Sequence, residues 1–368
     1  MTAGSGARVA QSTKARVRRA SLFQSNDFRL FLEQRSAGEV AVQLGNTAYA
    51  PILKDFVLED MRRTELEFLL NVSILAEGVT FRHYAGLRDK RLLDLWLESF
   101  DIGLLKNHLR TKLGTGKWDE HLSPDRILDL VSDFRLTLVD QNKLFKADTL
   151  KDVVAAVKNE SLRAAIMEAI PSGRENMDLA AGGSDFQDIV FAVGMILDRN
   201  YFDGLYTAVA NLGGDEGRML RMLVGTRVDL MNLDWIYRAR RFFGMSPEAS
   251  LTLIMKNRYR ANFEFLRKAA FAAPHSLAAT LEGTPYARVF DVDGVAPALK
   301  EVVLGSNIYR LLFAAAERVF LAGALGFQNV AAYLMLKELE VRDLVAVVEM
   351  VRYGFDRRKA SQVLVKPI

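Results

Sequence analysis

The stretch from Val224 to Glu248, VGTRVDLMNLDWIYRARRFFGMSPE, decides the fold that the sequence predicts. It reads as a turn, one amphipathic helix that begins at Asp229, and a second turn that leads into another helix. An acid in the first helical turn faces the positive end of the helix dipole, and a glycine after a helix adopts the left-handed cap conformation without a clash. The expected helix therefore begins at Asp229 and stops at Gly244.

The same pattern occurs twice more, from Asp101 to Gly114 and from Glu340 to Gly354. Each copy has an acid followed by a branched aliphatic residue, a leucine at the fifth position, and a glycine 13 to 15 residues after the acid. In the first two copies a Ser-Pro-acid run then follows, at Ser123 and Ser246, which is a typical helix start. A unit that recurs at roughly even spacing predicts a repeat architecture.

A second internal match supports the repeat. Five positions with identical spacing occur twice: Ala41, Leu44, Thr47, Tyr49 and Ala50, and then Ala278, Leu281, Thr284, Tyr286 and Ala287. Each string precedes one of the two outer acid-led units. Helix termination alone, with the threonine and tyrosine capping and packing, is a compatible explanation.

The composition predicts an all-α protein. The chain has 368 residues, of which 50% are hydrophobic, with only eight prolines and no cysteine. It contains no convincing run of alternating β residues joined by hairpin turns. Because the acid-led unit occurs three times, we expect three related helical lobes, at residues 1–130, 131–260 and 261–368.

The sequence predicts no catalytic residue, cofactor or metal site. The run Gly114–Lys117 resembles the end of a phosphate loop, but it lacks the upstream glycine, and Trp118 stands where Ser or Thr is needed. The four histidines show no metal-ligand spacing, and we expect His108 and His121 at the surface. A helical enzyme is therefore disfavoured.

Neither a membrane span nor a nucleic-acid surface is indicated. The most apolar window, Leu311 to Phe327, is interrupted by Glu317 and Arg318, whereas a spanning helix needs about 20 mostly apolar residues. The net charge of +4 is mild. Residues 1–19 carry five basic side chains and no acid, and we expect a frayed tail that leads into a helix. An arm that contacts acidic lipid or nucleic acid is the alternative.

Basic and aromatic side chains gather around the central unit: Arg227, Arg238, Arg240, Arg241, Trp235, Tyr237, Phe242 and Phe243. Nucleic-acid stacking, a protein interface and simple core packing are all compatible with this composition. At helical spacing, core packing of the aromatic residues is favoured.

Together these motifs resemble the C subunit of the bacterial and archaeal V/A-type ATPases, which is equivalent to the d subunit of the eukaryotic V-ATPase. The resemblance rests on Val228–Leu233 with Tyr237-Arg238, on Ala15–Arg18, on the Leu44-Thr47-Tyr49 string, on Phe100–Ile102 with Leu105 and Arg110, and on Lys337–Val341. It extends over nearly the whole chain. The chain departs from the family pattern at Gly103-Leu104 and at Arg342-Asp343, where the family shows an asparagine-type residue.

The resemblance implies a non-catalytic central-stalk subunit with no cofactor. Members of this family form a funnel of three similar lobes in a pseudo-threefold arrangement. The funnel sits on the membrane proteolipid ring, receives the tip of the central shaft, and couples the two for proton or sodium transport. Such a subunit is cytoplasmic and peripheral to the membrane, and the stator membrane subunit is a further candidate partner. A free-standing α-helical scaffold or adaptor unrelated to ion transport is the alternative.

Seven residues share positions in the repeats and are our candidates for partner binding: Asp101, Arg110, Arg227, Asp229, Asn232, Arg238 and Arg241. We expect them to line or brace the socket. In the structural alternative, the acid caps its own helix and the arginine pairs with a neighbouring lobe.

Overall fold

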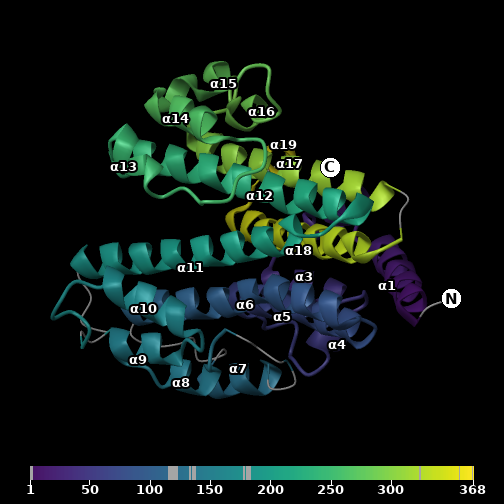
Figure 1. Cartoon of the computed structure of the whole chain (residues 1–368). Coiled ribbons are helices and arrows are strands. Elements are labelled where there is room, and N and C mark those ends of the chain that lie inside the picture. The colour runs from purple at the N-terminus through teal and green to yellow at the C-terminus, as the bar shows by residue number, and fades with distance from the viewer. Residues whose placement is uncertain are drawn as a thin grey trace. The chain divides into compact units, whose positions relative to one another are not determined.

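A computed structural model describes residues 3–114, 123–131, 134, 138–176, 179, 184–322, 325–355, 357–366 and 368. The chain is 74% helical, and no β-strand occurs among these residues (Figure 1). The predicted all-α class is therefore confirmed.

The chain divides into two compact units. One unit comprises Met1–Glu77, His83–Gly86 and Tyr206–Ile368, and the other comprises Gly78–Arg82 and Leu87–Leu205. Neither unit coincides with one of the three expected ranges. The division into three lobes stays a prediction.

The first unit holds most of the helices. Its α-helices are α1 (Ala3–Ala20), α2 (Ser25–Phe31), α3 (Ala37–Leu44), α4 (Ala50–Leu53), most of α5 (Arg63–His83), α12 (Gly214–Arg241), α13 (Pro247–Leu251), α14 (Phe263–Phe271), α15 (Leu277–Thr280), α16 (Ala287–Phe290), α17 (Lys300–Leu321), α18 (Phe327–Tyr353) and α19 (Arg357–Val363). Two short 3-10 turns, η3 (Pro274–Ser276) and η4 (Pro297–Leu299), precede α15 and α17.

The second unit is built on two long helices and four shorter ones. These are α6 (Leu87–Gly114), α7 (Pro124–Val131), α8 (Gln141–Phe145), α9 (Leu150–Ala156), α10 (Glu160–Ala169) and α11 (Ser184–Ala210), of which the last turn belongs to the first unit.

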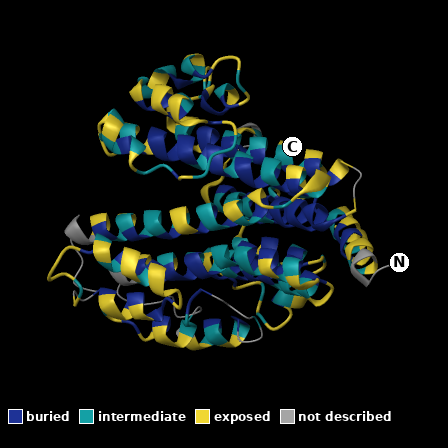
Figure 2. Cartoon of the chain, viewed as in Figure 1, coloured by how far each residue is buried: buried dark blue, intermediate teal, exposed yellow. Residues whose placement is uncertain are grey.

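Helix α18 is the core of the first unit. Most of its residues are buried, and its ribbon is largely dark blue in Figure 2. It contacts α1, α12 and α17. Buried residues on α18 include charged and polar side chains as well as apolar ones. Because a buried charge is costly unless it is hydrogen-bonded, these side chains need partners inside the fold.

The predicted helix starts at the three acids are wrong. Asp101, Asp229 and Glu340 lie near the middle of α6, α12 and α18, not at a helix end. Gly225, which the sequence indicates as a turn, lies inside α12. A Cβ atom there would stand 2.5 Å from Cβ of Tyr259, so the glycine permits close packing and does not mark a helix end.

Other start and stop signals are confirmed. Helix α18 ends at a left-handed cap at Gly354, with φ 63°, and Gly244 after α12 has φ 58°. The Ser246 side chain caps α13, and Pro247 is its first residue. Helix α7 begins at Pro124, as the Ser-Pro-acid run predicts.

We predict that Gly225→Ala destabilises the first unit by about 1–3 kcal/mol, because the added methyl group overpacks the contact with Tyr259. Gly305→Ala, inside α17, is the matched control. The nearest atom to a Cβ there is 3.9 Å away, so replacement should raise stability by about 0.5–1 kcal/mol. Denaturant titrations of both variants measure this, and equal effects would contradict the packing role of Gly225.

Candidate partner-binding site

Asp101, in the middle of α6, is fully buried and holds the chain segment that precedes α8. Its Oδ2 accepts hydrogen bonds from the backbone N–H groups of Leu138 at 2.7 Å and Val139 at 3.3 Å. Burial, together with the negative charge of Asp101, raises the pKa of Glu98, one turn earlier on α6, to about 7. The carboxylate is therefore an internal anchor for the second unit.

Asp229, in the middle of α12, is also fully buried and makes four contacts. Its carboxylate accepts hydrogen bonds from the backbone N–H groups of Tyr259 at 2.9 Å, Arg260 at 2.7 Å and Ala261 at 2.9 Å. It also accepts one from the hydroxyl of Tyr286 at 2.7 Å. Burial and the nearby carboxylate raise the pKa of Tyr286, so the phenol stays protonated and donates.

Glu340, in the middle of α18, repeats this arrangement. It accepts the backbone N–H of Phe23 at 2.5 Å and the hydroxyl of Tyr49 at 2.9 Å. The ammonium group of Lys337 lies 3.0 Å from the same carboxylate and 3.6 Å from the centroid of the Tyr49 ring. Burial lowers the pKa of Lys337, whereas the Glu340 charge opposes that shift.

The three anchors have one geometry. In each, the acid accepts a hydrogen bond from the backbone N–H of the residue just before a helix N-cap. These residues are Val139, Ala261 and Phe23. Tyr49 and Tyr286 occupy the same place in the two matched strings, and each donates to one of the acids. The internal sequence match therefore corresponds to a repeated hydrogen-bonded contact.

A second polar residue follows one turn later in two of the copies. Asn232 accepts the backbone N–H of Met255 at 2.8 Å, and Asp343 accepts those of Val365 at 2.8 Å and Lys366 at 2.9 Å. The side chain of Lys366 also donates to the carbonyl of Phe23. On α12, one continuous segment, residues 255–261, supplies the backbone donors to Asp229 and Asn232. On α18, the backbone donors to Glu340 and Asp343 come from Phe23 and from residues 365–366, which are far apart in the sequence.

The structure places the seven predicted residues in different settings. Asp101 and Arg110 belong to the second unit, and the other five belong to the first. Asp101, Asp229 and Asn232 are 0% exposed, which favours bracing over direct contact with a partner. The Arg110 side chain is exposed on α6.

The three central arginines have acidic neighbours. Arg227 pairs with Glu338 on α18 at 2.9 Å, Arg238 pairs with Asp234 one turn earlier at 2.8 Å, and Arg241 lies 3.9 Å from Glu301 on α17. The first pair is mostly buried, whereas the Arg238 and Arg241 side chains are more than half exposed. Arg227 therefore braces α12 against α18.

The aromatic cluster divides. Trp235 and Tyr237 are buried, as core packing predicts, but Phe242 and Phe243 are 54% and 56% exposed after the end of α12. The expectation that His108 lies at the surface is wrong: the ring is fully buried, and Nε2 lies 3.1 Å from the carbonyl oxygen of Ala147. His121 and Thr115–Trp118, which hold most of the phosphate-loop resemblance, lie outside the described residues.

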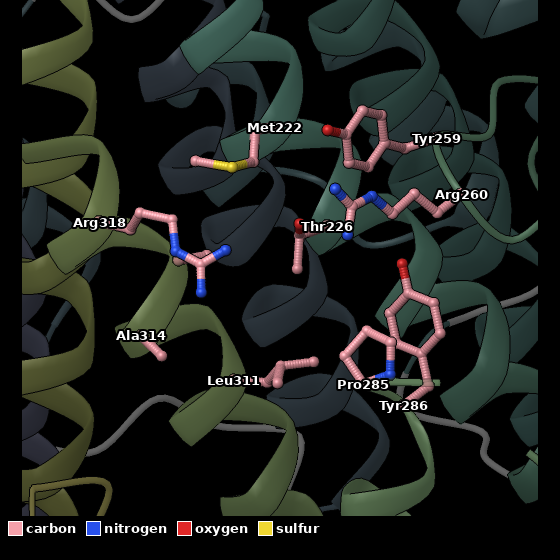
Figure 3. A pocket seen from close by; sticks show the side chains of 10 residues that line it. Met222, Thr226, Tyr259, Arg260, Pro285, Tyr286, Leu311, Ala314 and Arg318 are labelled. Carbon is pink, nitrogen blue, oxygen red and sulfur yellow. The ribbon is translucent and has the colours of Figure 1, made fainter. Parts of the chain in front are cut away.

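An open groove lies between α12 and α17, and the sequence interpretation missed it. Its walls are Met222 and Thr226 on α12, Leu311, Ala314, Ala315 and Arg318 on α17, and the loop residues Tyr259, Arg260, Pro285 and Tyr286. Figure 3 shows the Arg260 and Arg318 side chains extending toward the middle of the groove from opposite sides. Tyr286 lines this groove and also belongs to the repeated string of residues 278–287, so the string was a sequence signal that could have pointed to the groove.

Neither a metal site nor a membrane span occurs in the part of the chain that the structure describes. No cluster of three or more His, Asp or Glu side chains there could hold a metal ion. None of the helices described is both long and apolar enough to cross a membrane.

These features define an all-α protein whose long helices are fastened by buried acids and whose groove between α12 and α17 is open. Residues 11–363 match the family described as the ATP synthase (C/AC39) subunit. The chain therefore belongs to this family, whose members are non-catalytic subunits of A/V-type ATPases.

Two relatives are both named as the C subunit of an A-type ATP synthase. The protein of Methanobrevibacter smithii is 23% identical over 365 residues, which cover 96% of this chain and 87% of that protein. The protein of Methanosphaera stadtmanae is 27% identical over 151 residues, and this match spans 41% of the chain and only 35% of that relative's length.

We predict that Asp229→Asn destabilises the first unit by roughly 2–4 kcal/mol. The carboxylate of Asp229 accepts hydrogen bonds from three backbone N–H groups, whereas the NH2 group of an asparagine is itself a donor and cannot accept them. Asp215→Asn is the control, since its exposed pair with Arg218 should contribute at most about 1 kcal/mol. Thermal and denaturant unfolding measure both. A loss in Asp229→Asn no larger than in the control would contradict the anchor.

Proposed function

We propose that this chain is the central-stalk subunit of a rotary V/A-type ATPase, a socket that couples the central shaft to the membrane proteolipid ring. The match to the C/AC39 subunit family over residues 11–363 carries the proposal. On this proposal the chain is cytoplasmic and held at the membrane by the complex, and its three lobes form a funnel.

The polar anchors suit a part that transmits torque. A socket must pass force without changing shape, and a buried carboxylate that loses its N–H donors costs several kcal/mol. Asp101, Asp229 and Glu340 each fix the start of a distant segment in this way. In the first unit, the mostly buried Arg227–Glu338 pair adds a link between α12 and α18. These contacts support rigidity within each of the two units.

The candidate residues then take two roles. Asp101, Arg227, Asp229 and Asn232 brace the interior, as their burial supports. The exposed side chains of Arg110, Arg238 and Arg241 are available to line the socket.

The proposal predicts which proteins accompany the chain in membranes. The tagged full-length chain, extracted in mild detergent, should retain the shaft subunits and a small proteolipid, which mass spectrometry of the purified material identifies. The same extraction from cells with an untagged chain controls for contaminants. Recovery of the chain alone, or with soluble proteins only, would contradict the proposal and favour the free-standing scaffold.

A further inference from the structure

The groove between α12 and α17 has a counterpart elsewhere in the first unit. Tyr286 follows Tyr49 by 237 positions, and the first residue of α17, Lys300, follows the first residue of α5, Arg63, by the same 237. Glu340 on α18 follows Asp229 on α12 by 111. Helices α12 and α17 therefore correspond to α18 and α5.

The two helix pairs also join at corresponding ends. Arg63 at the start of α5 pairs with Glu349 near the end of α18. Glu301 at the start of α17 accepts the hydroxyl of Tyr237 at 2.8 Å and lies near Arg241, at the end of α12. The helices of each pair are antiparallel. In the first pair α5 carries the basic residue and α18 the acid, whereas in the second pair α17 carries the acid and α12 the basic residue.

Helix α1 covers the first of these pairs. On the α18 side, the Ser12 hydroxyl lies 3.2 Å from both the Gly326 carbonyl and Oδ1 of Asn329. On the α5 side, Arg18 lies 3.5 Å from Glu77, and the Lys14 ammonium lies 4.6 Å from the ring centroid of Tyr84.

The matching surface on α12 and α17 is open. Tyr333 on α18 is 1% exposed, whereas its counterpart Met222 is only half-buried. The counterpart of Glu77 is Ala314, which is exposed and lines the groove. The counterpart of Tyr84 is Leu321, which is 68% exposed. Among the described residues, no helix covers the place on α12 and α17 that corresponds to the position of α1 on α18 and α5.

The charges of the open groove specify what would fit it. In the covered copy, a basic residue of α1 meets an acid of α5 at Glu77. In the open copy Ala314 replaces that acid, the exposed side chains of Arg260 and Arg318 flank the groove, and none of the described lining residues is acidic. Guanidinium groups bind carboxylates strongly, and apolar residues such as Met222 and Leu311 suit the side of a helix.

We propose that the groove between α12 and α17 receives an α-helix of a partner protein, in the position that α1 occupies on α18 and α5, and that this helix presents carboxylates to Arg260 and Arg318. The identity of the partner rests on the proposed function, which makes the central shaft the protein that supplies the helix.

A site-specific cross-link tests the occupant directly, because the chain contains no cysteine. Ala314→Cys, labelled with a maleimide benzophenone in the detergent-extracted complex, should join on illumination to an acidic helical segment of a shaft subunit, which mass spectrometry identifies. Glu264→Cys, at an exposed position of α14 that does not line the groove, is the control and should not form this adduct. The absence of an intermolecular adduct from position 314, or an adduct to a segment without acids or to a second copy, would overturn the proposal.

Charge reversal tests the two arginines. The double variant Arg260→Glu and Arg318→Glu should retain at least tenfold less shaft subunit while its Tm stays within the range of the control, and replacement by lysine should restore most of the retention. Arg267→Glu with Arg288→Glu is the control, since it makes the same charge change at exposed positions outside the groove. Equal retention by both double variants would overturn the role of the arginines.

The two proposals can fail separately. If the unaltered chain retains no shaft subunit, the proposed function fails, and the cross-link from position 314 still reports whether an acidic helix of another protein fills the groove. If the unaltered chain retains the shaft and neither groove test responds, only the groove assignment fails.

Discussion

A carboxylate buried in the middle of a long helix must find hydrogen-bond donors inside the protein, because it has lost its water. The donors that meet it here are backbone N–H groups that would otherwise stay unpaired at the entry to another helix. Asp101, Asp229 and Glu340 each accept hydrogen bonds from the backbone N–H groups of such a segment, and the same hydrogen bonds stabilise the buried charge of the acid. This mutual requirement fixes where each of these segments crosses its long helix.

The anchor on α18 joins two segments that are far apart in the sequence. On α12 the backbone donors to Asn232 and Asp229 all lie within residues 255–261. On α18 the corresponding donors are Lys366 at one end of the chain and Phe23 near the other. Polar contacts at α18 therefore join two segments of the first unit that lie 343 residues apart in the sequence. Helix α1 then lies over α18 and α5, whereas the equivalent groove between α12 and α17 is open in the part of the chain that the structure describes.

Much of this could be predicted from the sequence, and the failures have physical causes. The Ser-Pro helix start at Ser246 and the left-handed Gly354 cap depend on neighbours within one or two turns, so the pattern predicts them. The repeated acids were visible in the sequence, but their place in mid-helix was not, because their partners are distant in sequence. The extent of α12 does not, because Gly225 resembles a breaker and is required by Tyr259, which is distant in sequence. The burial of Asp229 and His108 could not be predicted from the local sequence either, because their hydrogen-bond partners lie about 30 and 39 residues away. The Tyr49 and Tyr286 strings were visible as a match, but the acids that they contact were not.

The most direct measurement of the central claim is amide hydrogen exchange of the isolated full-length chain, followed by mass spectrometry of overlapping peptides. Buried acid anchors predict that the backbone N–H groups of Val139, Ala261 and Phe23 exchange as slowly as those inside the long helices, although they lie outside any helix. In Asp229→Asn, protection should be lost at residues 259–261 first. Exchange at all three positions as rapid as in exposed loops would show that the acids do not hold these segments, and would contradict the account.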